Sequence, residues 1–224
     1  MGIIGVVAAL TIPNLNASTG EAEKVAKVKK NYAQLNEALG RAVAKYGPIG
    51  TWFVNDGDDY DKMSKRFGER MTEFLKVSKV CGTTGTGCFS NKPYFSNSTL
   101  KFSDIYEEYY KNYEEELISN KFYRVVLADG TSVGFFSDWD MITVDIDGPN
   151  KGKNTEGIDI FRFGIYENTL MAREEAYLIN YDASIIDYNN GIYLSPVLWV
   201  LQNGNLDYLK CPDSLAWGTK TSCK

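Results

Sequence analysis

The chain begins with an apolar run that passes directly into a charged, periodic segment. Residues 3–15 are almost wholly apolar, and from Glu21 on apolar side chains recur every three or four residues. This spacing places them on one face of a helix. The positions are Val25, Val28, Tyr32, Leu35, Leu39, Val43 and Tyr46. Ser18 and Glu21 have the spacing of a capping box, which allows a helix to begin there, and Gly47-Pro48 ends it.

The other faces of this expected helix carry charged side chains. They are Lys24, Lys27, Lys30, Glu37, Arg41 and Lys45. We interpret them as a solvated helix surface, which is the usual role of charges opposite an apolar stripe.

Two further segments have helical periodicity. The first covers residues 61–77 and the second, rich in tyrosine and glutamate, covers residues 103–118. Both are typical of helices that lie on the surface of a domain with one face packed. The tyrosines of the second segment are expected to pack, and not to form a ligand platform.

The pattern changes to strands after Lys121. Residues 122–128 and 131–136 flank Asp129-Gly130, which is a strong signal for a β-hairpin. Residues 141–146 and 160–165 predict two more strands. The expected fold is α+β, with a long N-terminal helix packed on an antiparallel sheet of about four strands and with extra surface helices.

The C-terminal part predicts a short helix and a loop. Ser195 is suited to the N-cap, Pro196 to the first helical position and Gly204 to the end of the helix. With 224 residues the chain can bury one good core, so we divide it into an N-terminal helix, residues 1–46, and a globular head, residues 47–224.

The composition of the chain disfavours several classes of function. A net charge of −5 disfavours nucleic acid as a partner, because nucleic-acid-binding surfaces concentrate Lys and Arg. The chain has no histidine, which removes the commonest general base and metal ligand. There is no Gly-x-Ser-x-Gly motif, and paired carboxylates have no specificity among 29 acidic residues. We therefore expect a protein that is not an enzyme and has no cofactor.

The four cysteines form two local pairs along the chain, Cys81 with Cys88 and Cys211 with Cys223. Zinc sites use tighter spacing, so disulfides are favoured. Four cysteines allow three connectivities, of which the local one is the simplest. Disulfides would indicate folding in an oxidising, extracytoplasmic space.

One acidic loop could bind a metal ion. Asp145, Asp147, Asn150 and Asp159 supply oxygen ligands on a glycine-containing loop, which suits calcium. The spacing is not that of an EF-hand, and Lys151 and Lys153 bring positive charge into the loop. We favour a turn whose Asp and Asn side chains cap backbone groups, with calcium as the alternative.

The apolar run itself has several interpretations. It is shorter than the roughly 20 residues that a membrane span needs, and no basic residue precedes it as one would precede the apolar part of a signal peptide. A buried core helix remains an alternative, but Pro13 in the middle of the run should kink or end such a helix.

The run resembles the N-terminal helix of type IV pilins, in which an Ile-Ile-Gly-x-x-Ala-Ala-x-x-Ile-Pro core lies in a long helix kinked at the proline. The matching residues are Ile3, Ile4, Gly5, Ala8, Ala9, Ile12 and Pro13. The Asp-x-Asp-Gly-Pro-Asn and Gly-x-Asp-x-Phe segments resemble a loop of pilin-like heads. A C-terminal disulfide loop is also similar to that family. Because the family's Phe-Thr-Leu-Ile-Glu start is absent, we interpret the chain as a shortened form of a pilin-like protein.

The resemblance implies a structural subunit of a type IV pilus, or of the related pseudopilus of type II secretion. Its helix would run on from the apolar segment, with a break around Ser18 to Gly20. Its partners would be other pilin subunits and the inner-membrane assembly machinery of a bacterial cell envelope, from which it would pass into an extracellular filament. The chain as given is expected to stay soluble, and its large head with two cysteine pairs mildly favours a pilus subunit.

The competing function is a secreted or surface-displayed ligand-binding module, similar to an adhesin. Exposed aromatic side chains would then contact a surface ligand. The candidates are Tyr181, Tyr188, Tyr193 and Trp217.

Overall fold

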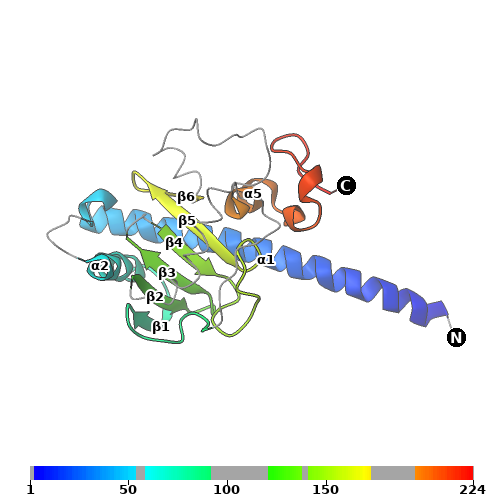
Figure 1. Cartoon of the computed structure of the whole chain (residues 1–224), viewed down its shortest axis with the longest axis horizontal. Helices are drawn as coiled ribbons and strands as arrows, with labels where there is room; N and C mark the ends of the chain where they lie inside the picture. The colour runs from blue at the N-terminus through cyan, green and yellow to red at the C-terminus, as the bar shows by residue number, and fades with distance from the viewer. Residues whose placement is uncertain (1–2, 54–58, 92–120, 138–140, 173–194, 224) are drawn as a thin grey trace.

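The computed structural model describes residues 3–53, 59–91, 121–137, 141–172 and 195–223, and residues 3–18 by their helical backbone alone. A long helix, α1 (Ile3–Tyr46), packs along one face of a six-stranded antiparallel sheet. Helix α2 (Tyr60–Thr72) lies beside the sheet near the end of α1, and α5 (Pro196–Asn203) lies at the opposite edge (Figure 1). The α+β prediction is therefore confirmed at this level.

Helix α1 is continuous over 44 residues. Two expectations for it are wrong: it neither begins at Ser18 nor breaks between Ser18 and Gly20, and it also contains Pro13. A single helical glycine costs only about 1 kcal/mol relative to alanine, which is too little to interrupt a helix that the head supports further on. The helix ends as predicted, with Gly47 at a φ of 84° and its amide bonded to the carbonyl of Val43.

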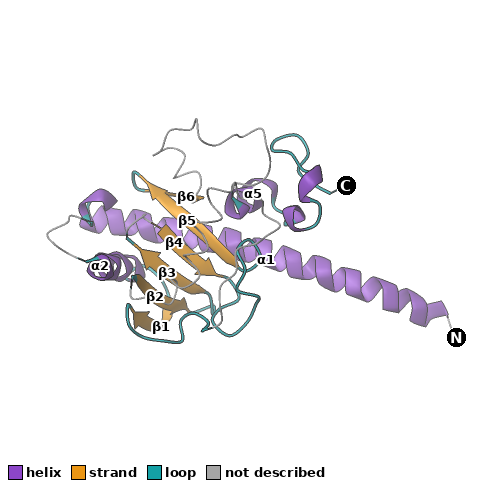
Figure 2. Cartoon of the chain, in the orientation of Figure 1, coloured by secondary structure: helices purple, strands orange, loops and turns teal. Residues whose placement is uncertain are grey.

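The sheet is a simple meander in the order β1-β2-β3-β4-β5-β6 (Figure 2). Its strands are β1 (Val77–Gly82), β2 (Phe122–Leu127), β3 (Ser132–Phe136), β4 (Met141–Asp145), β5 (Ile160–Tyr166) and β6 (Thr169–Ala172). The predicted hairpin at Asp129-Gly130 joins β2 to β3, with Val126 paired to Ser132 next to the turn.

Six strands replace the expected four, because both edge strands lack a clear signal. The middle of β1 is exposed, and its register shifts twice along β2, so its apolar side chains do not alternate. Strand β6 has four residues and follows a tight turn in which Glu167 has a φ of 55°. Glutamate is not a residue type that predicts such a turn.

The core lies between α1 and the sheet. The predicted stripe supplies Val28, Leu35 and Leu39, each fully buried, and its other positions pack against the same cluster. From the sheet, alternate residues such as Val125, Phe135, Ile142 and Phe163 meet them. The second face of the sheet carries a smaller cluster that includes Phe122, Phe136 and Met141, covered in part by Cys88 and Phe89.

The shorter helices follow their sequence signals. Helix α2 starts at Tyr60 and ends at Thr72, five residues before the predicted end, because Val77 begins β1. In α5 the Ser195 side chain accepts the amide of Leu198, and Gly204 ends the helix with a φ of 67°. The helix expected over residues 103–118 lies outside the described residues.

Candidate functional site

The N-terminal part of α1 extends away from the head, with the chain's N-terminus at its far end (Figure 1). All seven residues that carry the pilin resemblance lie in this part, which the structure describes as helical backbone. Within the described residues, no helix combines the length and the apolar character that crossing a membrane requires.

A charged stripe on α1 attaches the helix to three separate parts of the head. Its members are spaced three residues apart: Glu21, Lys24, Lys27 and Lys30. We call these four residues and the groups that they contact the helix junction.

The central contact of the helix junction is Asp147, in the loop between β4 and β5. Its carboxylate accepts a hydrogen bond from Lys27 Nζ at 3.2 Å, and Lys24 Nζ lies 3.6 Å away. Lys24 also donates to the carbonyl of Ile158 in the same loop. Partial burial alone would lower the pKa of Lys27, but the hydrogen bonds with Asp147 and Glu23 raise it above its ordinary value.

The β2–β3 turn makes the second contact. Lys30 Nζ lies 2.6 Å from a carboxylate oxygen of Asp129, whose other oxygen accepts the amide of Thr131. Burial opposes ionisation of Asp129, but Lys30 and Thr131 hold its pKa below the ordinary value. The residue that shapes the hairpin turn therefore also binds α1.

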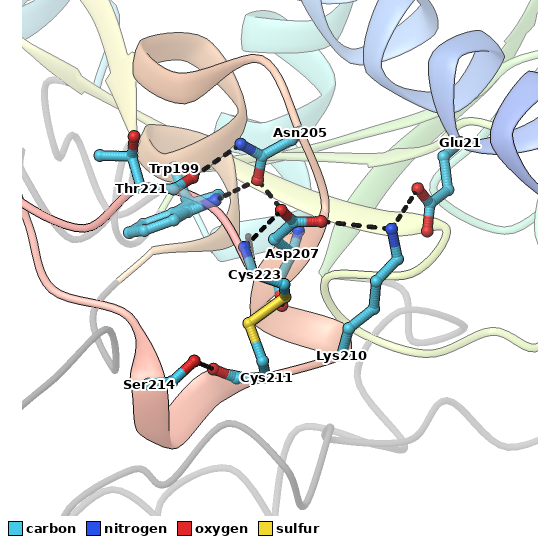
Figure 3. The surroundings of a disulfide bond; sticks show 9 residues. All are labelled: Glu21, Trp199, Asn205, Asp207, Lys210, Cys211, Ser214, Thr221 and Cys223. Carbon is cyan, nitrogen blue, oxygen red and sulfur yellow. Dashed lines mark hydrogen bonds and ion pairs between the residues drawn. A yellow bond between two sulfur atoms is a disulfide. The ribbon is translucent and has the colours of Figure 1, made fainter.

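The C-terminal disulfide loop makes the third contact (Figure 3). Lys210 Nζ lies 2.6 Å from Glu21 on α1 and 3.2 Å from Asp207. Asp207 also accepts the amide of Cys223, the last cysteine of the Cys211–Cys223 disulfide. Asp207 therefore links the disulfide loop to the lysine that contacts α1.

Asn205 stiffens the same loop. Its side chain accepts from the indole of Trp199 and from the amide of Asp207, and it donates to the carbonyl of Thr221 (Figure 3). Nearby, the buried Tyr208 hydroxyl donates to the carbonyl of Gly157 at 2.6 Å. This bond joins the C-terminal segment to the β4–β5 loop, so two parts of the helix junction support each other.

The candidate metal ligands lie in the β4–β5 loop and bind mainly its own backbone. Asp145 accepts the amides of Asp147 and Gly148, and Asp159 accepts those of residues 153–155. Both aspartates are fully buried. These are the bonds of a turn capped by carboxylates, the interpretation that we favoured.

The other two candidates have different surroundings. Asp147 binds the lysines of α1, and Asn150 is exposed beside an open cleft of about 500 Å³ between the β4–β5 loop, β1 and the β2–β3 turn. Across the described ranges, no three acidic or cysteine side chains gather closely enough to hold a metal ion. Calcium binding stays an untested prediction.

Asp145 has the strongest electrostatic perturbation in this loop. Burial, together with the charges of Asp159 and Asp147, raises its pKa to about 8, although the two amide hydrogen bonds act in the opposite direction. Its Oδ2 has no hydrogen-bond partner in the structure. The protonated form of Asp145 is therefore favoured at neutral pH.

The cysteines pair locally, which matches the simplest of the three connectivities. The Cys81–Cys88 disulfide closes the loop that follows β1, and Cys211–Cys223 closes the loop at the C-terminus. Cys88 is buried on the second face of the sheet, where it contacts the cluster around Phe89.

The proposed ligand-binding aromatics are mostly outside the described residues. Tyr181, Tyr188 and Tyr193 lie there, whereas Trp217 is partly buried and packs edge-on against Trp199, with ring centroids 4.9 Å apart. Packing against the core explains Trp217 without a ligand.

Sequence reasoning missed the helix junction. The lysines of α1 were expected to be solvated, but Lys24 and Lys27 are partly buried by the β4–β5 loop. The signal that could have found them is the three-residue spacing of Glu21, Lys24, Lys27 and Lys30. Neighbours in this series lie next to each other on the helix surface, and the series winds around the helix over about two and a half turns.

Comparisons with protein-family models, with curated proteins and with solved structures give no match.

Proposed function

We propose that this chain is a structural subunit of a filament of the type IV pilus or pseudopilus kind, with a pilin-like fold. One observation carries the proposal: α1 is a single 44-residue helix whose later half packs into the head and whose earlier part extends beyond it. The extending part contains the apolar run of residues 3–15. An apolar helix that the head does not cover needs a partner, because burying apolar surface is worth roughly 25 cal/mol per Å².

In this proposal the apolar runs of neighbouring subunits pack together and form the centre of the filament. The head lies outside, and the helix junction fixes its orientation on α1. Three contacts at Glu21, Asp147 and Asp129 would keep the head from pivoting when the helix is bound by its neighbours. The two disulfides suit a head that functions outside the cytoplasm. The proposed location is the bacterial cell envelope, with the filament extracellular.

Cysteine cross-linking tests the proposal. Ala8→Cys lies in the apolar run, and the matched control Glu37→Cys lies on the exposed side of α1 within the head. In cells that carry a pilus assembly system, oxidation of the Ala8→Cys variant should give a ladder of covalent oligomers, and the control should stay monomeric. Monomer alone from both variants, with no filaments visible by electron microscopy, would contradict the proposal.

A further inference from the structure

The end of the head where α1 leaves it carries exposed lysines outside the helix junction. The carboxylates of the helix junction already have lysine partners: Glu21 and Asp207 share Lys210, Asp129 pairs with Lys30, and Asp147 lies beside two lysines of α1. Three further lysines, all in loops of the head, are exposed at this end and make no ion pair with any residue of the described part of the chain. They are Lys151 and Lys153 in the β4–β5 loop and Lys220 in the C-terminal loop. We call these three residues the basic collar.

The basic collar is carried by two loops that both contact α1. The β4–β5 loop touches the helix at Lys24 and Lys27, and the C-terminal loop touches it at Glu21. Lys151 also borders the open cleft, where Lys27 and Lys79 are further cationic residues. The chain as a whole has a net charge of −5, and the same two loops also carry acidic residues, so the basic collar is defined by the exposure of its lysines and not by a net positive charge of the loops.

The apolar run lies on the same side. Leu15, its last residue, precedes Lys24 by a helical rise of about 14 Å, which is comparable with the Debye length of about 10 Å at 0.1 M salt. The run itself would be about 20 Å long as a helix, shorter than the roughly 30 Å hydrocarbon core of a bilayer. A chain that inserts this run into one side of a bilayer would bring the basic collar toward the lipid headgroups.

We propose that the basic collar binds the anionic headgroups of a membrane surface while the apolar run is inserted, which orients the head before assembly. The proposal rests on the membrane stage of the proposed function. Exposed, unpaired lysines suit this role because they can approach a diffuse layer of negative charge without first breaking an ion pair. A lipid surface is favoured over an acidic protein because the apolar run and the collar lie on the same side of the head.

Vesicle flotation of the full chain tests this. The probes are vesicles of phosphatidylcholine alone and vesicles that also contain phosphatidylglycerol. Each lysine near an anionic surface strengthens binding about fivefold. The K151E/K153E variant should therefore lose about tenfold or more in binding to the anionic vesicles, and keep its binding to the neutral ones. High salt should remove the difference between the two vesicle types.

The matched control is K62E/K65E, which makes the same change of charge on the exposed side of α2, away from the point where α1 leaves the head. It should bind both vesicle types as the parent chain does. Equal losses in the two variants, or equal binding of the parent chain to neutral and anionic vesicles, would overturn the basic collar alone. Absence of binding to either vesicle type would overturn the membrane stage as well. Charge-dependent binding to vesicles, together with no oligomer ladder from the Ala8→Cys cross-linking experiment, would support the basic collar and overturn the proposed filament.

Discussion

At the scale of single residues, the β4–β5 loop holds two aspartates with different electrostatic roles. Asp145 is fully buried with one oxygen unpaired, and Asp147 faces two lysines of α1. The first contributes to the internal structure of the loop, and the second attaches the loop to the helix. Their substitution should therefore have different consequences.

Asp145→Asn should change how stability depends on pH. The pKa of Asp145 is raised from 3.8 to about 8 in the folded chain. The folded state therefore binds the extra proton between these values, and its contribution to stability declines as the pH rises toward 8. The amide cannot ionise, so the variant should gain stability relative to the parent chain at pH 8 and not near pH 4, as measured by urea unfolding.

Asp129→Asn is the matched control for that experiment, because the pKa of Asp129 is lowered in the folded chain. Its carboxylate contributes stability above the unfolded pKa of 3.8, and that contribution falls as the pH drops through the lower, folded value. The variant should lose stability at neutral pH. If both variants gain stability at pH 8, the burial of Asp145 is not the cause of the gain in Asp145→Asn.

The pair of Lys27 and Asp147 should have a measurable coupling energy. Their side chains are 35% and 18% exposed, whereas those of Arg41 and Glu37, an ion pair on the same helix, are 60% and 73% exposed. A double-mutant cycle with Lys27→Met and Asp147→Asn should give about 0.5–1 kcal/mol, and the cycle at Arg41 and Glu37 less than about 0.5 kcal/mol. Equal values for the two pairs would argue against a structural role for the helix junction.

At the scale of elements, the packing of α1 on the sheet and the closure of the C-terminal loop are separate sources of stability. The helix contributes a fully buried stripe, and the loop contributes a disulfide and the contact between Lys210 and Glu21. Each can be removed without touching the other.

Replacing both Cys211 and Cys223 with serine should destabilise the head by about 2–3 kcal/mol, since the disulfide closes a loop with a sequence separation of 12. The Cys81–Cys88 disulfide closes a shorter loop, with a sequence separation of 7. Replacing these two cysteines with serine should therefore cost about 0.5 kcal/mol less, on loop entropy alone. Chemical unfolding measures both. Only the first replacement should also weaken the coupling between Lys210 and Glu21.

Much of the element pattern could be predicted because it follows from local rules. The stripe from Val25 to Tyr46, the Asp129-Gly130 hairpin and the caps of α5 depend on periodicity and on residue types suited to turns. The edge strands and the helix junction could not be predicted in the same way. Strand β1 forms through its pairing with β2, and the contact of Lys24 is with a loop more than a hundred residues later in the chain.

At the scale of the whole molecule, a head is attached to a helix that extends beyond it (Figure 1). The core and its two disulfides lie in the head, and α1 is joined to it by the buried stripe and by the charged helix junction. The apolar run lies in the part of α1 that extends away from the head (Figure 1). Removing residues 3–18 should therefore leave the unfolding temperature of the head nearly unchanged.

Filament formation through the apolar run can be tested by sedimentation and electron microscopy of the full chain beside the chain without residues 3–18, after removal of detergent. The full chain should form filaments of regular width, and the shortened chain should remain a folded monomer with the same circular dichroism spectrum from its head. A full chain that has a folded head but stays monomeric, or forms only irregular aggregates, would contradict the proposed filament.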